Sequence, residues 1–341
     1  MTNDAVWLDG SVPVRTYWRD DGPWIDWCHL GIERFREPFF DATIGQQIRK
    51  PFNLLFRPQT PLAVIEDWLE QHPALPPTGF IFHMSRCGST LMSQMLAACP
   101  ENIAISEALP IDTALRPDIG GPGMNDELRI RLLRAVVGGL GQRRRGDELR
   151  YFIKFDCWHT LYLDLIRRAF PTVPWLFLYR DPVEVLVSQM RQRGVQTVPG
   201  MIRPELFGID FADAVQMPAA DYCAKVLAAI CQAALDRRRV DDGLLINYAE
   251  LPDAVWSNVP RHFRTEWTVA DRDAMTEALK FDAKAPYFAF VPDAAEKRRQ
   301  ASAPILAAAE RWLDPVYCGL EALRLGRPDA GPPIPGRSVA R

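Results

Sequence analysis

A turn of small residues between two apolar segments has the composition of a phosphate-binding loop. Residues 79–84 form a short apolar run typical of a buried strand, and residues 90–98 have the apolar spacing of a helix. The turn and the residues that follow it are Arg86, Cys87, Gly88, Ser89, Thr90 and Leu91. Small residues leave backbone N–H groups free to surround an anion, and the dipole of the next helix favours negative charge. We therefore expect an oxyanion site; the alternative is a turn that only caps the helix.

The same turn lacks the residue that a nucleoside-triphosphate loop requires. Such a loop places a lysine directly after its last glycine, whereas Ser89 follows Gly88 here and the cation, Arg86, comes two residues earlier. An ATP or GTP site is therefore disfavoured. A P-loop kinase or NTPase stays open as an alternative, as does a nucleotide-binding protein without catalytic activity.

A second candidate phosphate contact follows the strongly apolar run at residues 175–179. Arg180 comes directly after this run, Asp181 and Pro182 are typical of a helix start, and Ser188 lies eight residues beyond Arg180. An arginine at a helix N-terminus can hold a phosphate with two hydrogen bonds, and a serine hydroxyl can add a third. The alternative is a simple helix start with the serine facing outward.

Strands and helices alternate along the part of the chain that carries these motifs. Apolar runs at residues 79–84, 103–105, 151–155, 175–179 and 244–247 are separated by helical patterns. Such runs are typical of a parallel sheet covered on both faces, so we predict a three-layer α/β fold. We expect an aromatic-rich, irregular extension packed on the core at residues 1–60, the α/β domain at 61–326 and a mobile tail at 327–341.

The composition narrows the classes of function. Of 341 residues, 48% are hydrophobic and 24% charged, which is typical of a globular protein, and the net charge of -3 disfavours a nucleic-acid partner. We expect no membrane span, because no apolar run approaches about 18 residues. We expect no secretory signal, because residues 1–10 contain two acids and no apolar h-region. Seven scattered cysteines without a C-x-x-C pair indicate reduced thiols in the cytoplasm and no zinc site.

Together the two motifs resemble those of the sulfotransferase superfamily, which uses 3′-phosphoadenosine 5′-phosphosulfate (PAPS) and releases adenosine 3′,5′-bisphosphate (PAP). The turn at 86–90 is similar to the family's 5′-phosphosulfate loop, with Cys87 in place of a small hydroxyl residue. Arg180 and Ser188 have the spacing of the family's 3′-phosphate motif. The resemblance spans about residues 78–315 and implies a P-loop-like sulfotransferase fold.

Further positions resemble the branch that contains the tyrosylprotein sulfotransferases and bacterial relatives. Glu107 lies twenty-one residues after Arg86, where that branch has its catalytic glutamate, and Lys154 matches the lysine that stabilises the transferring group. Tyr248 matches a tyrosine near the adenosine. Lys297 and Arg298, within residues 290–302, are similar to the basic loop that closes over the cofactor.

The resemblance implies a mechanism and leaves the acceptor open. Glu107 would act as general base toward a hydroxyl or amine, while Arg86 and Lys154 stabilise the sulfuryl and phosphate oxygens without a metal. Glu107 could instead be a helix-start acid and Lys154 a solvent-facing lysine. His83 and His159 are expected to be structural rather than basic. The acceptor could be a peptide, carbohydrate, lipid or small molecule, and the protein could be a homodimer.

Overall fold

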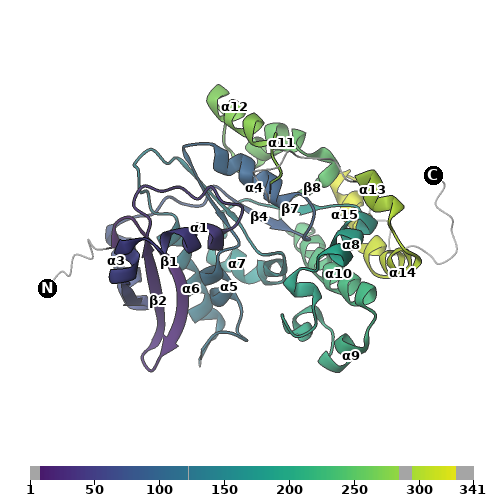
Figure 1. The fold of residues 1–341 in the computed structure, drawn as a ribbon, viewed down its shortest axis with the longest axis horizontal. Coiled ribbons are helices and arrows are strands. Elements are labelled where there is room, and N and C mark those ends of the chain that lie inside the picture. The colour runs from purple at the N-terminus through teal and green to yellow at the C-terminus, as the bar shows by residue number, and fades with distance from the viewer. Residues whose placement is uncertain (1–7, 122, 284–293, 328–341) are drawn as a thin grey trace. The chain divides into compact units, whose positions relative to one another are not determined.

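Five short strands form a parallel sheet in the computed structural model, which describes residues 8–121, 123–283 and 294–327 (Figure 1). They are β4 (Gly79–His83), β5 (Asn102–Ser106), β6 (Arg150–Lys154), β7 (Trp175–Tyr179) and β8 (Leu244–Asn247). Their order is β5-β6-β4-β7-β8. Nearly every residue in them is buried, as expected for unbroken apolar runs flanked by helices. The predicted three-layer α/β fold is confirmed.

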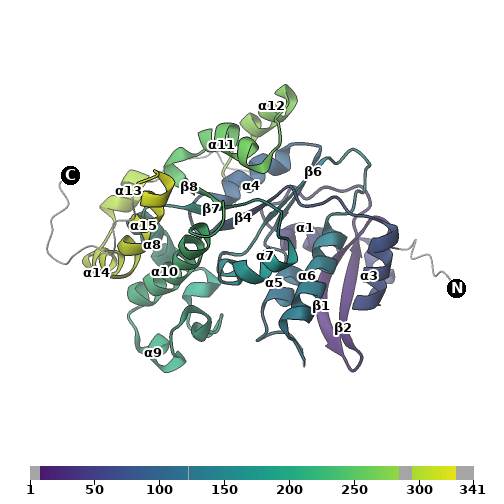
Figure 2. The same ribbon diagram turned by 180° about the vertical axis from the view of Figure 1, so that it is seen from behind.

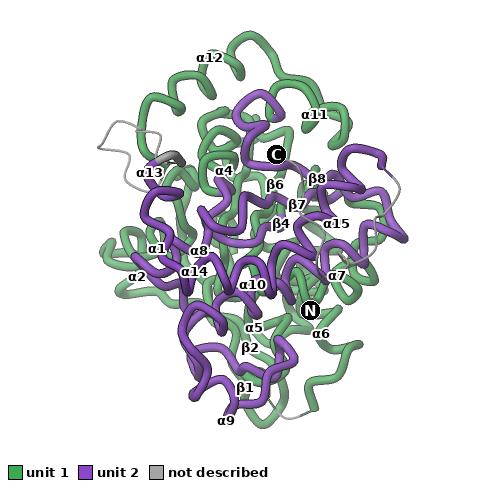
Figure 3. Tube along the Cα trace, turned by 90° about the vertical axis from the view of Figure 1, so that its right-hand side faces the viewer, with its two compact units in different colours: residues 1–81, 90–174, 255–290 green, residues 82–89, 175–254, 291–341 purple. Residues whose placement is uncertain are grey.

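The chain forms two compact units, each assembled from separate stretches of sequence (Figure 3). Unit 1 contains residues 1–81, 90–174 and 255–290, and unit 2 contains residues 82–89, 175–254 and 291–341. The predicted division into an extension, a main domain and a tail stays a prediction. Residues 328–341 of the expected tail lie outside the described residues.

The N-terminal part of unit 1 is more regular than the sequence suggested. Strands β1 (Ser11–Arg19) and β2 (Gly22–His29) form an antiparallel hairpin that β3 (Gln59–Pro61) extends, so the expectation of an irregular segment was wrong. Helices α1 (Phe40–Gln47), α2 (Pro51–Leu55) and α3 (Leu62–Gln71) complete this region. The indole of Trp27 donates to Thr60 at 2.9 Å and packs edge-on against Trp68 at 5.9 Å, which gives the tryptophans the apolar contacts they need.

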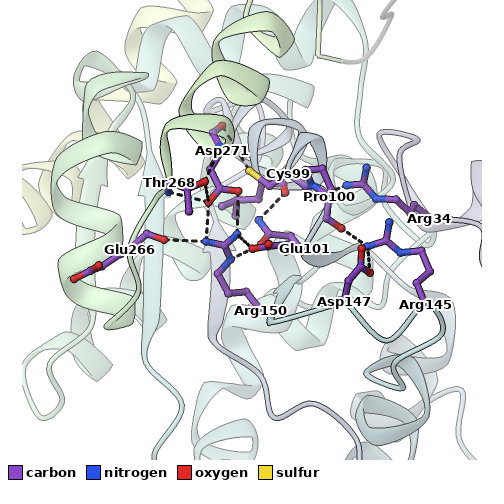
Figure 4. Close-up of polar contacts among 12 residues, drawn as sticks. Arg34, Cys99, Pro100, Glu101, Arg145, Asp147, Arg150, Glu266, Thr268 and Asp271 are labelled. Atoms are coloured by element: carbon purple, nitrogen blue, oxygen red, sulfur yellow. Dashed lines mark hydrogen bonds and ion pairs between the residues drawn. The ribbon is translucent and has the colours of Figure 1, made fainter.

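The remaining helices of unit 1 surround its strands (Figure 2). They are α4 (Ser89–Ala98), α5 (Leu109–Leu115), α6 (Asp126–Leu140), the 3₁₀ segment η2 (Cys157–Tyr162), α7 (Leu163–Ala169), α11 (Asp253–Phe263) and α12 (Val269–Ala278). Arg150, at the start of β6, holds α12 in place (Figure 4). Its guanidinium binds both oxygens of Asp271, at 3.0 and 2.9 Å, and the Glu266 carbonyl at 2.8 Å.

Unit 2 consists of β7 and β8 with a separate set of helices. The helices are α8 (Pro182–Arg191), η3 (Val195–Thr197), η4 (Pro204–Phe207), α9 (Phe211–Gln216), α10 (Ala219–Arg238), η5 (Tyr248–Glu250), α13 (Ala294–Arg299), α14 (Ala303–Ala308), the π-helical η6 (Ala309–Leu313) and α15 (Asp314–Arg324). Helix α8 begins as predicted, because the Asp181 carboxylate accepts a hydrogen bond from Glu184 N–H at 3.1 Å and Pro182 occupies the first helical position.

Two chain-wide features complete the description. Among the helices of the described ranges, none combines the length and apolar character needed to cross a bilayer. All seven cysteines fall within the described ranges and are free thiols, six of them buried.

Candidate functional site

The predicted phosphate turn has an unusual backbone. Ser85 and Arg86 have φ angles of +82° and +53°, and Gly88 has +86°. Only four non-glycine residues in the described part of the chain have positive φ, and a third one, Glu107, is also a predicted site residue. Non-glycine residues in this region are strained, and such strain persists where the surrounding structure enforces it, often at functional sites. The strained positions therefore support the sequence-based choice of site.

Hydrogen bonds from neighbouring segments hold this turn. The backbone N–H of Ser85 donates to Nδ1 of His83 at 3.1 Å, and the Ser85 hydroxyl accepts from the amide of Gln189 at 3.0 Å. The other end of the Gln189 side chain accepts from Gly194 N–H at 2.9 Å. Because Gln189 is completely buried, it ties the turn firmly to α8. His83 is a structural partner of the turn, in agreement with the expectation.

The remaining residues of the turn are largely enclosed. The Arg86 guanidinium donates to the backbone oxygen and the side-chain oxygen of Gln192, at 2.8 and 3.1 Å, and burial lowers its pKa. The Cys87 thiol donates to the Leu178 carbonyl at 3.2 Å. Ser89 and Thr90 are buried at the start of α4, and Leu91 follows on the same helix.

Tyr248 connects the turn to the second predicted phosphate contact within unit 2. A Cβ on Gly88 would lie 2.7 Å from the Tyr248 ring, so a side chain larger than hydrogen does not fit there. On its other side, the guanidinium carbon of Arg180 lies 3.9 Å from the centre of the Tyr248 ring. The structure thus brings together three residues that the sequence placed in one nucleotide site.

Acidic side chains hold the cations of this region in place. Arg180 pairs with Glu184 at 2.7 Å, and Arg298 binds the other Glu184 oxygen at 3.0 Å and Asp181 at 2.9 Å. Glu184 was not predicted, although its position four residues after Arg180 on one helix face could have indicated it. Arg298 lies on helix α13 together with the buried Lys297, so this part of the expected basic loop is helical, whereas residues 290–293 of that loop lie outside the described residues.

Ser188 lies half-buried on α8, and no hydrogen bond of its side chain is found within the described ranges. Its role as a phosphate contact stays a prediction. The arrangement on α8 places Ser188 two helical turns from the start of the helix where Arg180 and Asp181 lie.

In unit 1, Glu107 and Lys154 form an ion pair at the ends of two neighbouring strands. Ser106 pairs with Lys154 in the β5–β6 register, and Glu107 N–H donates to the Lys154 carbonyl at 2.8 Å. The Lys154 ammonium contacts the Glu107 carboxylate directly. The Lys154 side chain is 0% exposed and that of Glu107 23% exposed. Lys154 is thus not the solvent-facing lysine of the alternative reading, and Glu107 combines a fixed position with access to solvent.

A group of buried, hydrogen-bonded side chains includes residues of η2, which follows β6 in the chain. His159 Nε2 donates to Asp112 at 2.8 Å, since Nδ1 accepts the Asp156 backbone N–H at 3.2 Å. Trp158 donates to the same Asp112 oxygen at 2.7 Å, and Arg116 pairs with the other one at 3.3 Å. Both nitrogens of the fully buried His159 are occupied, so this ring is structural, as expected.

The two aspartates of this group have opposite pKa shifts. Burial would raise the pKa of Asp112, but hydrogen bonds from His159 and Trp158 lower it below its usual value. Burial raises the pKa of Asp156 well above its usual value, and the carboxylates of Glu107 and Asp112 raise it further against the effect of Lys154. Asp156 therefore favours its neutral form beside the Glu107–Lys154 pair.

Asp112, Asp156 and His159 also place three potential metal-ligand atoms within 4.8 Å of one another. Carboxylate and imidazole are common metal ligands, but each of these groups already takes part in the hydrogen bonds described above. Absence of a metal in the mechanism stays a prediction.

Phe39 and Asp41, at the start of α1, lie near the Glu107–Lys154 pair and were not predicted from the sequence. The Lys154 ammonium lies 5.2 Å from the centre of the Phe39 ring, directly before α1. Burial and the Glu107 carboxylate raise the pKa of Asp41, in the first turn of α1, although Asp41 keeps an exposed surface. No local motif marks these residues, because they come from the segment at 1–60 that matched nothing in sequence.

The predicted site residues therefore fall into two groups. Those of unit 2 are Arg86, Cys87, Gly88, Ser89, Arg180, Ser188, Tyr248, Lys297 and Arg298, and those of unit 1 are Thr90, Leu91, Glu107 and Lys154. Unit 2 holds the cations and strained turn suited to binding phosphate, and unit 1 holds the acid–base pair. The roles of these residues stay predictions.

The family described as the sulfotransferase family matches residues 77–261. Among solved structures, a sulfotransferase from Alicyclobacillus acidocaldarius is 18% identical, with 74% of this chain and 96% of that chain covered and a TM-score of 0.42. A sulfotransferase domain from the curacin biosynthetic pathway is 16% identical, with coverages of 75% and 99% and a TM-score of 0.45.

A third solved structure, retinol dehydratase in complex with retinol and PAP, is 15% identical, with coverages of 76% and 87% and a TM-score of 0.35. No curated protein sequence matches the chain.

Proposed function

Because this chain belongs to the sulfotransferase family, we propose that it transfers the sulfuryl group of PAPS to a hydroxyl or amine of an acceptor. The observation that carries this proposal is the Glu107–Lys154 pair. A buried ammonium and a partly exposed carboxylate, fixed at the ends of adjacent strands, are the charges that such a transfer requires. The strained backbone of Glu107 supports a functional rather than a purely structural role.

The residues of the two predicted phosphate motifs suit the two phosphate groups of PAPS. The amides of the turn at 86–90 and the Thr90 hydroxyl would hold the 5′-phosphosulfate, while Arg180 and Ser188 would hold the 3′-phosphate. Tyr248 would pack near the adenosine, with Lys297 and Arg298 covering the nucleotide. The fit is supported by Gly88, whose contact with Tyr248 leaves room for no side chain. When bound, PAPS supplies an activated sulfuryl group.

Glu107 is proposed as the general base. An acceptor hydroxyl is a poor nucleophile while it holds its proton, so a carboxylate must take that proton as the oxygen attacks. The ion pair with Lys154 fixes the Glu107 carboxylate and leaves part of it exposed to a substrate. Lys154 and Arg86 would balance the negative charge that develops on the transferring and leaving oxygens.

The proposal also covers metal use, cellular location and partners. Lys154 and Arg86 supply the positive charge that a metal ion provides in other transfer sites, so the proposed reaction runs without a metal. We place the protein in the cytoplasm, with an acceptor substrate as partner rather than nucleic acid or a membrane, and with a homodimer as the expected assembly.

The experiment compares three ligands and then follows turnover. Thermal unfolding is measured with PAP, with adenosine 5′-monophosphate, which lacks the 3′-phosphate, and with ATP plus magnesium. At about 100 times its dissociation constant, PAP should add about 2.7 kcal/mol of stability. Sulfate transfer from labelled PAPS to a panel of acceptors then completes the test. Stabilisation by ATP and not PAP would indicate a kinase or NTPase, and PAP binding without transfer to any acceptor a non-catalytic protein.

A further inference from the structure

Unit 2 contains a group of buried hydrogen-bond donors that have no acceptor. We call Arg193, Gln196 and Tyr222 the Arg193 cluster. Two nitrogens of the Arg193 guanidinium, Nε and Nη2, are buried without a hydrogen-bond partner. The same holds for Nε2 of Gln196 and the hydroxyl of Tyr222, whose residues are 3% and 0% exposed.

The three side chains come from two adjoining segments of unit 2. Gln196 lies in η3, which packs against α10, and Tyr222 lies in the first turn of α10. The Gln196 amide covers the backbone of Gly194, where a Cβ would lie 2.8 Å from Nε2. The charge of Arg193 is close enough to Tyr222 to counteract the rise in the pKa of its phenol that burial causes.

Nearby acids are engaged elsewhere. Asp221, in the same helical turn as Tyr222, accepts from the indole of Trp312 at 2.8 Å. Glu205 lies 3.7 Å from Arg203 and is partly exposed. The Arg193 cluster is therefore a set of donors, one of them charged, that no carboxylate of its own unit pairs with in the described structure.

Such a set is physically unusual. Buried polar groups are almost always hydrogen-bonded, and a buried donor without a partner lowers stability, the more so when it is charged. A single orphan can be explained by an ordered water. Three side chains on two adjoining segments offer such donors here: one is a guanidinium, and one lies in the first turn of a twenty-residue helix. This set matches the needs of an oxyanion.

We propose that the Arg193 cluster binds an oxyanion — a carboxylate, sulfate or phosphate group — that the acceptor substrate carries in addition to its reacting hydroxyl or amine. This assignment of the acceptor class rests on the proposed sulfotransferase function, whereas the oxyanion site itself does not.

The cluster is linked to the proposed donor site through the chain. Gln192, directly before Arg193, accepts both hydrogen bonds of Arg86, and Gly194, directly after it, donates to Gln189, which also binds Ser85. The residues on both sides of Arg193 are thus fixed to the phosphate turn. The segment that would hold an oxyanion at Arg193 is therefore also positioned by the turn that is proposed to bind PAPS. This arrangement suits an acceptor that reacts with PAPS.

The first test measures sulfate binding to protein saturated with PAP, so that the proposed cofactor site is occupied. Isothermal titration with inorganic sulfate should show one site per chain. Arg193→Met should weaken it about ten- to hundred-fold, because a charge-assisted contact is lost, and Tyr222→Phe should weaken it less. Both variants should bind PAP like the parent and should be at least as stable as the parent in sulfate-free buffer, because each substitution removes a buried donor that has no partner.

Arg191→Met is the matched control, because it removes the same charge two residues away on the surface. It should leave sulfate binding unchanged. The site is overturned if PAP-saturated parent binds no sulfate, or if Arg191→Met weakens binding as much as Arg193→Met. If the protein does not bind PAP at all, the proposed function fails, but the same sulfate titration still tests the cluster.

The second test addresses the source of the oxyanion. Transfer to 4-hydroxyphenylacetate is compared with transfer to 4-methylphenol, which differs in lacking the carboxylate. The parent should prefer the acid in kcat/KM, and Arg193→Met should reduce that preference at least ten-fold while transfer to 4-methylphenol changes little. A preference that is absent in the parent, or unchanged in the variant, overturns the assignment to the acceptor and leaves a site for free oxyanions.

Discussion

Some buried charges of the two compact units are paired in different ways. In unit 1, Lys154 is paired with Glu107, and Arg150 binds both oxygens of Asp271. In unit 2, Arg193 has no ion-pair partner in the described structure, and Arg180 shares one carboxylate, Glu184, with another cation. These ion pairs of unit 1 are complete without a ligand, whereas Arg193 in unit 2 has two buried guanidinium nitrogens without an acceptor.

This difference separates two tasks of the proposed reaction. Proton transfer needs an acid–base pair held in one geometry, and internal ion pairs provide that. Binding of anionic groups needs donors that are not satisfied until the ligand arrives. Added anions should thus affect unit 2 most, whereas pH should act mainly on unit 1. The following variants test this contrast.

Lys154→Met should have the largest effect. It removes the buried ammonium that fixes Glu107 and that is proposed to stabilise developing negative charge, so turnover should fall about 10²- to 10³-fold. Affinity for PAP, measured by titration calorimetry, should stay within a few-fold of the parent. Turnover within a few-fold of the parent would place Lys154 outside the reaction.

Asp271→Asn should destabilise the protein by about 3 kcal/mol at neutral pH, because it leaves the Arg150 charge without its buried partner. Hydrogen bonds from Arg150 and Thr268 outweigh burial and lower the pKa of Asp271. A lowered pKa contributes stability above the unfolded value of about 3.9 that is lost as the pH falls through the folded value. The difference in the free energy of unfolding between the variant and the parent, measured by denaturant titration, should therefore shrink below about pH 4. A stability difference that does not change with pH would show that the charge of the Asp271 carboxylate does not contribute to stability.

Arg180→Ala should weaken PAP binding by about 1.5–3 kcal/mol, since a charge-assisted contact to phosphate is lost. The fold should be little affected, because Glu184 keeps its contact with Arg298 at 3.0 Å. Arg191→Ala, an exposed arginine on the same helix, is the control and should bind PAP like the parent. Equal affinities of all three proteins in calorimetry would remove the phosphate role of Arg180.

Asp156→Asn should have the smallest effect and the opposite pH dependence from Asp271→Asn. Burial raises the pKa of Asp156, so its folded form holds a proton that the unfolded chain releases above about pH 3.9. The stability of the parent therefore falls as the pH rises toward the folded pKa, whereas the neutral asparagine avoids this loss. As the pH rises from 5 to 8, the melting temperature of the variant should increase relative to that of the parent. A relative decrease over this range would mean that an ionised Asp156 is stabilised in the native protein.

Much of the sheet followed from the sequence because its signals are local. Each strand of the sheet contains a short apolar run, and the proposed phosphate turn at 86–90 is likewise a short contiguous motif. The β1–β2 hairpin was missed because Pro13, Gly22 and Pro23 interrupt its alternation, and its strands are stabilised by contacts such as that of Trp27 with Trp68.

The contacts that the sequence did not show join residues far apart in the chain. Asp112 meets His159 across 47 positions, and Phe39 approaches Lys154 from a segment without a recognisable motif. The Arg193 cluster was missed for a related reason. Its significance lies in donors that lack partners, and the absence of a partner becomes visible only after the chain has folded.

The most direct test of the account is the single-turnover rate of Glu107→Gln at saturating PAPS, measured beside its PAP affinity. Glutamine keeps the size and hydrogen-bonding reach of glutamate but cannot take up the acceptor proton. The account predicts a rate about 10²- to 10⁴-fold below the parent, with PAP affinity within a few-fold. A rate close to that of the parent, or a loss of PAP affinity in step with the rate, would contradict the assignment of Glu107 as the base.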